Sequence, residues 1–187
     1  MKSREFDSRI QSLYFIALIP DHPVQSELIQ FKEYARDVFN SSKSLNSPAH
    51  ITLLPPFSLE RKSESVLIAD IEKCIRGEKS FYLELNGFGH FGNKVIFVNV
   101  GENETASRLH KKLHADLEKY HDYGVETNRK FHPHITVAFK DLIPEQFKAG
   151  WDYYSQKSFE RIIRIGQVDL LRHDNKKWNS IKYFRLN

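Results

Sequence analysis

The tripeptide His-Ile-Thr occurs twice in this 187-residue chain, at residues 50–52 and again at residues 134–136. The chain has nine histidines but only four threonines, so chance alone would rarely place two copies in it. Each copy lies in an apolar frame, AHITLL and PHITVAF, that is typical of a β-strand. Because residues i and i+2 of a strand share one face, each copy predicts a buried isoleucine with its histidine and threonine on the opposite face.

The segments around the two tripeptides repeat the same order of elements. An apolar run at residues 13–20 predicts a strand, and the apolar spacing over residues 23–40 predicts a helix, before the first tripeptide. Residues 94–100 and 104–120 predict the same pair of elements before the second. A duplicated strand-helix-strand unit can place its copies about a pseudo-twofold axis. Two histidines and two threonines would then meet in one site.

The remaining segments predict outer layers. Residues 63–76 and 144–157 have helical spacing, and residues 81–88 alternate as a strand. We expect the first tripeptide strand to stop at Pro55-Pro56, and we expect residues 161–172 and 177–186 to form a closing hairpin. The stripe expected to be buried on the first helix is Val24, Leu28, Phe31, Ala35 and Val38.

Together these elements predict an α+β fold in which residues 1–187 form a single domain with two lobes. We expect mostly antiparallel sheets to line a central cleft and helices to cover the outer faces. The sequence GFGHFG at residues 87–92 fits the pattern GxGxxG, but it lies between two strands and opens no helix. It therefore predicts a hairpin or bulge and not a dinucleotide site.

Composition indicates the cellular compartment and the type of ligand. The single cysteine excludes an intramolecular disulfide and a thiolate metal cage, which fits a reducing compartment. The N-terminus is charged and lacks the apolar stretch of a signal peptide, and no run is long enough to span a bilayer. We expect a cytoplasmic protein, a monomer with no membrane association. The net charge of +4 suits an anionic ligand but is weak evidence for nucleic acid.

Both tripeptides, each with the apolar residue that follows it, match the paired motif of the 2H phosphoesterases, the RNA 2′,3′-cyclic phosphodiesterase or 2′-5′ RNA ligase-like superfamily. The segments HITLLPPF, FYLELNGFGHFG and FHPHITVAF also resemble that family, so the resemblance covers about residues 10–187. It implies a bilobal pseudo-symmetric fold and metal-independent hydrolysis or formation of phosphodiesters. It also implies that His134 activates water and that His50 protonates the leaving oxygen.

The residue types suit this chemistry. Opening a cyclic phosphate needs a base for water and an acid for the leaving ribose oxygen, on opposite sides of phosphorus. Imidazole has an ordinary pKa of about 6.5, so His50 and His134 can serve as the two partners. Thr52 and Thr136 can donate to the nonbridging oxygens, where a fixed donor stabilises the transition state. We therefore expect neither a metal nor another cofactor.

Other residues are weaker candidates. Arg129 and Lys130 precede the second tripeptide strand and could hold a 5′ phosphate or an RNA backbone. Phe57 and Phe139 could stack on a base, with core packing as the alternative, and His132 could share the face of the second motif.

The spacing of His110 and His114 can bind zinc in a helix. No acidic or cysteine partner accompanies them in the sequence, so we expect a solvated helix face.

The sequence therefore predicts a metal-independent phosphodiesterase that hydrolyses 2′,3′-cyclic phosphates of RNA ends or nucleotides. The expected partner is RNA or a nucleotide with a cyclic phosphate. Two alternatives stay open: a 2′-5′ RNA ligase, because the same groups catalyse the reverse step, and a noncatalytic RNA- or nucleotide-binding module of the same fold.

Overall fold

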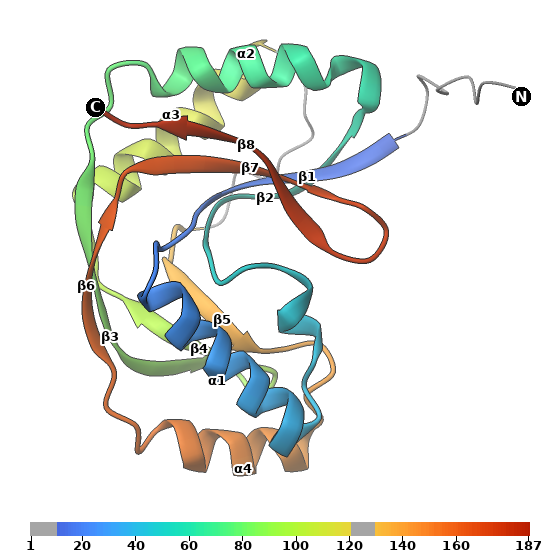
Figure 1. The fold of residues 1–187 in the computed structure, drawn as a ribbon, viewed down its shortest axis with the longest axis vertical. Helices are drawn as coiled ribbons and strands as arrows, with labels where there is room; N and C mark the ends of the chain where they lie inside the picture. The colour runs from blue at the N-terminus through green and yellow to red at the C-terminus, as the bar shows by residue number, and fades with distance from the viewer. Residues whose placement is uncertain (1–10, 121–129) are drawn as a thin grey trace, which may run out of the picture.

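The computed structural model describes residues 11–120 and 130–187, which form eight strands, four α-helices and two 3-10 helices (Figure 1). The strands are β1 Gln11–Leu18, β2 Ile51–Glu60, β3 Phe81–Phe91, β4 Val95–Val100, β5 His134–Ala138, β6 Glu160–Ile165, β7 Gln167–His173 and β8 Trp178–Arg185. The helices are α1 Val24–Phe39, η1 Lys43–Asn46, η2 Arg61–Ser63, α2 Glu64–Ile75, α3 Glu104–Tyr120 and α4 Pro144–Tyr154. Over these residues, no helix combines the length and the apolar character that crossing a membrane would require.

The strands of the described residues form one sheet in the order β6-β3-β4-β5-β2-β1-β7-β8, with antiparallel neighbours throughout. The order is symmetric about its centre. The central strands are β2 and β5. Next to them lie β1 and β4, the first strands of the two repeats, and then β7 and β3. The predicted α+β fold with pseudo-twofold symmetry is confirmed, although the two lobes share a single curled sheet (Figure 1).

Each repeat sends its helix to the other half of the sheet. Helix α1 follows β1 but contacts β5, and α3 follows β4 but contacts β2. Helix α4 packs beside α1, and α2 packs beside α3, so each lobe in Figure 1 has a pair of helices. This exchange ties the repeats together, because neither lobe is built from one repeat alone.

Strand β1 is buried on both of its faces. Tyr14, Ile16 and Leu18 belong to the main core between the sheet and the helices. Phe15 points to the opposite face, where it packs with Leu171 of β7 in a small second cluster. The face away from the helices is therefore partly apolar as well.

Strand β2 does not stop at Pro55-Pro56, so that prediction is wrong. The strand runs on to Glu60, and its pairing with β1 shifts on both sides of Ile16. The two prolines fall in one of these shifts, where two residues of β2 stand opposite the single residue Phe15. A bulge tolerates proline because a residue in it need not donate to the ladder.

The predicted closing hairpin is also different. Residues 161–172 do not form one strand, because β6 and β7 are separate strands with only Gly166 between them. Strand β6 pairs with β3 at one edge of the sheet, whereas β7 pairs with β1 and β8 in the other half. The buried positions change parity at this break, from Ile163 and Ile165 in β6 to Val168 and Leu170 in β7. The chain therefore pairs with different strands before and after Gly166.

The predicted hairpin or bulge at GFGHFG is confirmed. The pairing of β3 with β4 shifts between Leu85 and Phe88, and Gly87 in that shift has a φ of +61°. Gly92, with a φ of +54°, lies in the turn that leads to β4. Glycine adopts positive φ without the steric cost that other residues meet.

Replacing Ile135 by alanine should destabilise the fold, because the side chain is fully buried in the middle of the sheet. We expect a loss of about 2–5 kcal/mol in the free energy of unfolding, measured with urea. The matched control is Ile162→Ala on β6, where the side chain is 71% exposed, and we expect a change within about 0.5 kcal/mol. Equal losses in the two variants would contradict the assigned packing.

Candidate active site

The two His-Ile-Thr motifs meet at the centre of the sheet. Ile51 of β2 pairs with Ile135 of β5, and in the described residues this is the one paired position that joins the two halves. Both isoleucines are fully buried in the main core. Because successive side chains of a strand alternate between faces, the histidine and threonine of each motif project from the face away from the helices.

The antiparallel register decides which of these polar side chains are opposite each other. With the two isoleucines paired, His50 stands opposite Thr136, and Thr52 stands opposite His134. The two histidines therefore lie on a diagonal, where residues of an ordinary sheet are about 7–8 Å apart. A spacing of this kind leaves room for one phosphate group between two imidazoles.

Both imidazole rings are held in the same way. His50 Nδ1 lies 2.8 Å from the carbonyl oxygen of Pro48, and His134 Nδ1 lies 2.8 Å from that of His132. A carbonyl oxygen can only accept, so Nδ1 carries the proton in both rings. Nε2 is then the nitrogen that can take a proton or give one up.

A phenylalanine of the neighbouring strand flanks each histidine. The ring of Phe15 on β1 lies 4.8 Å from that of His50, and the ring of Phe97 on β4 lies 5.0 Å from that of His134. Trp178 of β8 packs edge-on against Phe15 at 4.7 Å and extends the aromatic surface on the His50 side. The rings limit how far either imidazole can turn.

Gly89 of β3 makes room for Phe97. A Cβ at this position would lie 2.7 Å from the ring of Phe97 and 2.6 Å from the side-chain oxygen of Asn99. Both distances are far inside ordinary contact. The second glycine of GFGHFG therefore allows a ring to pack beside His134.

Burial shifts both histidines toward the neutral form. It lowers the pKa of His50 to about 4, helped by the positive charge of Lys32 and opposed by the hydrogen bond to Pro48. Burial also lowers the pKa of His134, again opposed by its bond to a backbone carbonyl. Without a bound anion both imidazoles are therefore neutral near pH 7, and a bound anion would raise both pKa values.

A cavity of about 340 Å³ opens beside the motifs, a size within the range of small-molecule sites. Its lining residues are Phe15, Lys32, Ser44, Ser47, His50, Thr52, Pro56, Thr136, Phe139, Lys140 and Trp178. His134 flanks the cavity, because it stands opposite Thr52. The only charged side chains of the described residues in this lining are two lysines, which suits an anionic ligand.

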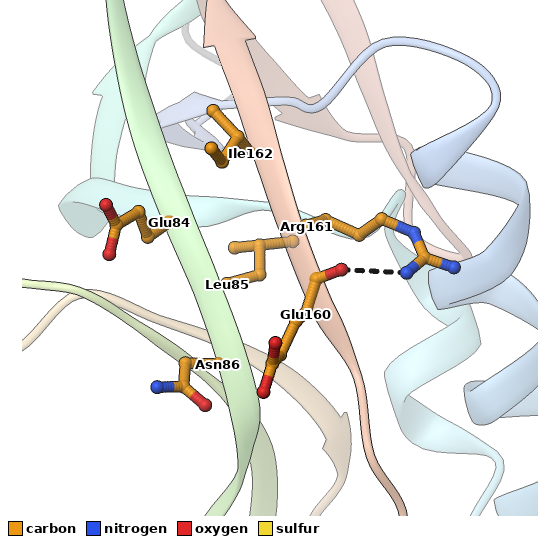
Figure 2. Close-up of a pocket in the computed structure, with 6 residues that line it drawn as sticks. All are labelled: Glu84, Leu85, Asn86, Glu160, Arg161 and Ile162. Atoms are coloured by element: carbon orange, nitrogen blue, oxygen red, sulfur yellow. Dashed lines mark hydrogen bonds between the residues drawn. The ribbon is translucent and has the colours of Figure 1, made fainter.

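Figure 2 shows a different hollow, of about 440 Å³, over β3 and β6. Its lining includes two carboxylates, and Arg161 reaches away from it toward α1, where it pairs with Glu27 at 2.9 Å. No histidine or threonine of the described residues lines it, and its two carboxylates do not suit an anionic phosphate. We therefore place the candidate site in the smaller cavity beside the motifs.

The structure separates the two phenylalanines that were predicted to stack on a base. Phe139 lines the cavity. Phe57 is only 3% exposed and packs against Tyr14 in the main core, so its prediction as a substrate contact is wrong. It stands an even number of residues from Ile51 and falls on the same buried face.

Of the predicted residues near the second motif, Lys130 and His132 are in the described part of the chain. Lys130 is exposed, whereas Arg129 lies outside the described residues. The His132 ring is exposed and 6.1 Å from that of His134, and its carbonyl holds His134 in place.

The predicted solvated helix face at His110 and His114 is wrong. Both side chains are half-buried, and His110 Nδ1 donates to the carbonyl of Leu53 in β2 at 2.7 Å. Their rings are 4.4 Å apart, on the helix-covered side of the sheet. Over residues 11–120 and 130–187, no three His, Cys, Asp or Glu side chains gather closely enough to hold a metal ion.

Sequence reasoning missed Lys32, which is only 2% exposed and lines the cavity. The buried positions of α1 are Leu28, Lys32, Ala35 and Phe39, whereas Val38 of the predicted stripe is 50% exposed. A lysine at a buried position of an apolar stripe was the signal that could have found it.

Comparisons with known proteins agree with this architecture. The matching family model, the 2′-5′ RNA ligase superfamily, covers residues 20–177. A protein of Geobacillus sp. (strain WCH70), provisionally named a phosphoesterase, is 27% identical over 177 residues, which are 91% of this chain and 94% of that protein. The RNA 2′,3′-cyclic phosphodiesterase of Thermotoga maritima is 26% identical over 103 residues, 53% of this chain and 54% of its own.

A solved structure, E. coli LigT complexed with 3′-AMP, has the same fold with a TM-score of 0.67 at 15% identity. The alignment covers 95% of this chain and 99% of LigT. The family model spans most of the chain, from just after β1 to just before β8, and includes both His-Ile-Thr motifs. The protein therefore belongs to the 2′-5′ RNA ligase superfamily, the 2H phosphoesterases.

Proposed function

We propose that this protein hydrolyses 2′,3′-cyclic phosphates of RNA ends or nucleotides, using His50 and His134 as an acid-base pair without a metal. The observation that carries the proposal is the pairing of the two motifs at one position of the sheet. That register supports a site with two imidazoles in the same tautomer and two hydroxyls around one point. The cyclic phosphodiesterase of Thermotoga maritima supports this class of substrate.

The proposed reaction is an in-line displacement at phosphorus. One neutral imidazole takes a proton from water through Nε2 as the water oxygen bonds to phosphorus. The bond from phosphorus to one ribose oxygen breaks, and the other histidine, as an imidazolium, gives that oxygen its proton. Thr52 and Thr136 donate to the nonbridging oxygens and stabilise the charge that develops on them.

The base can be assigned to either histidine. The family resemblance gives the base role to His134. Burial, which lowers the pKa of His50 to about 4, favours His50 as the neutral base in the free enzyme. The anionic phosphate raises the pKa of whichever imidazole acts as the acid. In either assignment the bound substrate favours the protonated form of the histidine that acts as the acid.

The rest of the cavity supports a nucleotide. Phe139 and Trp178 offer rings on which a base can stack, and Lys140 at the rim can pair with a backbone phosphate. LigT, which has this fold, was crystallised with 3′-AMP. We infer that the nucleoside lies on the aromatic side of the cavity, next to His50.

Replacing His50 or His134 by alanine should lower kcat/KM by about 100- to 10,000-fold, because each variant lacks one proton-transfer group. The double variant should be little worse than the poorer single one, since the pair acts as a unit. The assay uses nucleoside 2′,3′-cyclic phosphates and RNA with a cyclic end, in EDTA, and identifies the 2′ or 3′ product.

His90→Ala is the matched control, because His90 Nδ1 also bonds a carbonyl two residues away, at 2.7 Å, but outside the cavity. It should keep full activity. Folded single variants with wild-type rates, or loss of wild-type activity in EDTA, would contradict the proposal.

Removing one threonine hydroxyl should cost less than removing a histidine. We expect Thr52→Ala and Thr136→Ala each to lower kcat by about 10- to 1,000-fold, because a donor to the transition state is lost. Thr105→Ala in the first turn of α3 is the control and should leave kcat unchanged. Wild-type kcat in both motif variants would exclude the threonines from phosphate binding.

The pH profile of kcat/KM should be bell-shaped with its maximum below about pH 6.5. Activity rises as the base loses its proton and falls as the acid loses its proton, and in the free enzyme both pKa values are lowered. The kcat profile should lie at higher pH, because a bound phosphate raises the pKa values of both histidines. A kcat/KM that still rises above pH 8 would rule out this pair.

A further inference from the structure

Lys32 sits under the loop that leads into the first motif. Its ammonium nitrogen lies 2.9 Å from the carbonyl oxygen of Ser44, 3.1 Å from that of Ser47 and 3.2 Å from that of Pro48. The side chain is 2% exposed, so water does not satisfy it. A single side chain of α1 thus gathers three carbonyls of the segment 44–48.

The number of acceptors identifies the charge state. A lysine ammonium has three N–H donors, whereas the neutral amine has two and would turn its lone pair toward a carbonyl. Burial lowers the pKa of Lys32 to about 7, and three acceptors oppose that shift because they stabilise the charged form. The geometry is that of a buried cation in the wall of the cavity.

This cation is one carbonyl group away from a histidine of the proposed acid-base pair. The oxygen of Pro48 accepts from Lys32 Nζ at 3.2 Å and from His50 Nδ1 at 2.8 Å. The same contact therefore fixes the loop, the tautomer of His50 and the distance between the two groups.

The other charged groups around this loop are few. Lys140 is exposed on the cavity wall, and His134 is the nearest titratable group on β5. The carboxylate of Asp141 does not line the cavity, and it accepts from the backbone N–H of Ser42 at 2.8 Å and of Lys43 at 3.0 Å. No acidic side chain of the described residues lines the cavity to neutralise the ammonium.

We propose that Lys32 is a positioning residue of the active site: its buried ammonium fixes the loop that holds His50 and supplies the positive charge that draws an anionic phosphate to that ring. The proposal rests on the proposed function of the two histidines. Before the phosphate binds, the ammonium disfavours a second positive charge on His50. When the phosphate binds, its negative charge offsets that repulsion, and His50 becomes easier to protonate.

The test replaces Lys32 by methionine, which keeps the length of the side chain and removes its charge. We expect the pKa of His50, followed by NMR of histidine-labelled protein, to rise relative to wild type, and kcat/KM to fall on the order of 10-fold or more. Lys32→Arg keeps the charge, so it should keep the pKa of His50 low. Lys111→Met on the exposed face of α3 is the control and should change neither quantity.

An unchanged His50 pKa in a folded Lys32→Met variant would overturn the proposal, even if the histidine variants are inactive. A shifted pKa in a protein that hydrolyses no cyclic phosphate would uphold the placement of the charge and refute the proposed function instead. If Lys32→Met does not fold, NMR of the lysine side-chain nitrogens of the wild type decides. A slowly exchanging Lys32 ammonium at pH 7 that responds to inorganic phosphate supports the role, and a neutral amine overturns it.

Discussion

One backbone pairing, between Ile51 and Ile135, determines what the face of the sheet away from the helices can do. A slip of one residue in either strand would turn a histidine into the core and an isoleucine into the cavity. The buried isoleucines resist such a slip, since each would lose its place in the main core. The helices add to this, because α1 and α3 each pack on the central strand of the other repeat. The geometry of the candidate site is thus a consequence of core packing.

Charge and burial then set the chemistry of the site. The rings of Phe15 and Phe97 shield the two imidazoles, and backbone carbonyls fix their tautomers. Lys32 is a charged side chain buried next to a core of mostly apolar side chains, and its three carbonyl acceptors come from the loop that leads to His50. A site with neutral imidazoles and a nearby ammonium is suited to an anion that changes the protonation of the imidazoles when it binds.

The spacing of apolar residues correctly predicted the helices and strands whose buried faces follow a regular helical or alternating pattern. The bounds of α3 and the strand character of both motifs came from spacing alone. The errors fall where non-local pairing decides: the strand that continues through Pro55 and the chain that changes partners at Gly166. Lys32 was missed because an apolar stripe was assumed to contain only apolar residues. No local signal shows that three carbonyls of a distant loop will surround it.

The most direct measurement is a crystal structure of the protein with a nucleoside 3′-phosphate bound. We predict that the phosphate lies between the two motifs, with its oxygens about 2.7–3.2 Å from Nε2 of His50 and of His134 and within reach of the threonine hydroxyls. The ring nitrogens that face away from the phosphate should still bond their backbone carbonyls. A phosphate bound elsewhere, or one that contacts only one of the two imidazoles, would contradict two-histidine catalysis at this site.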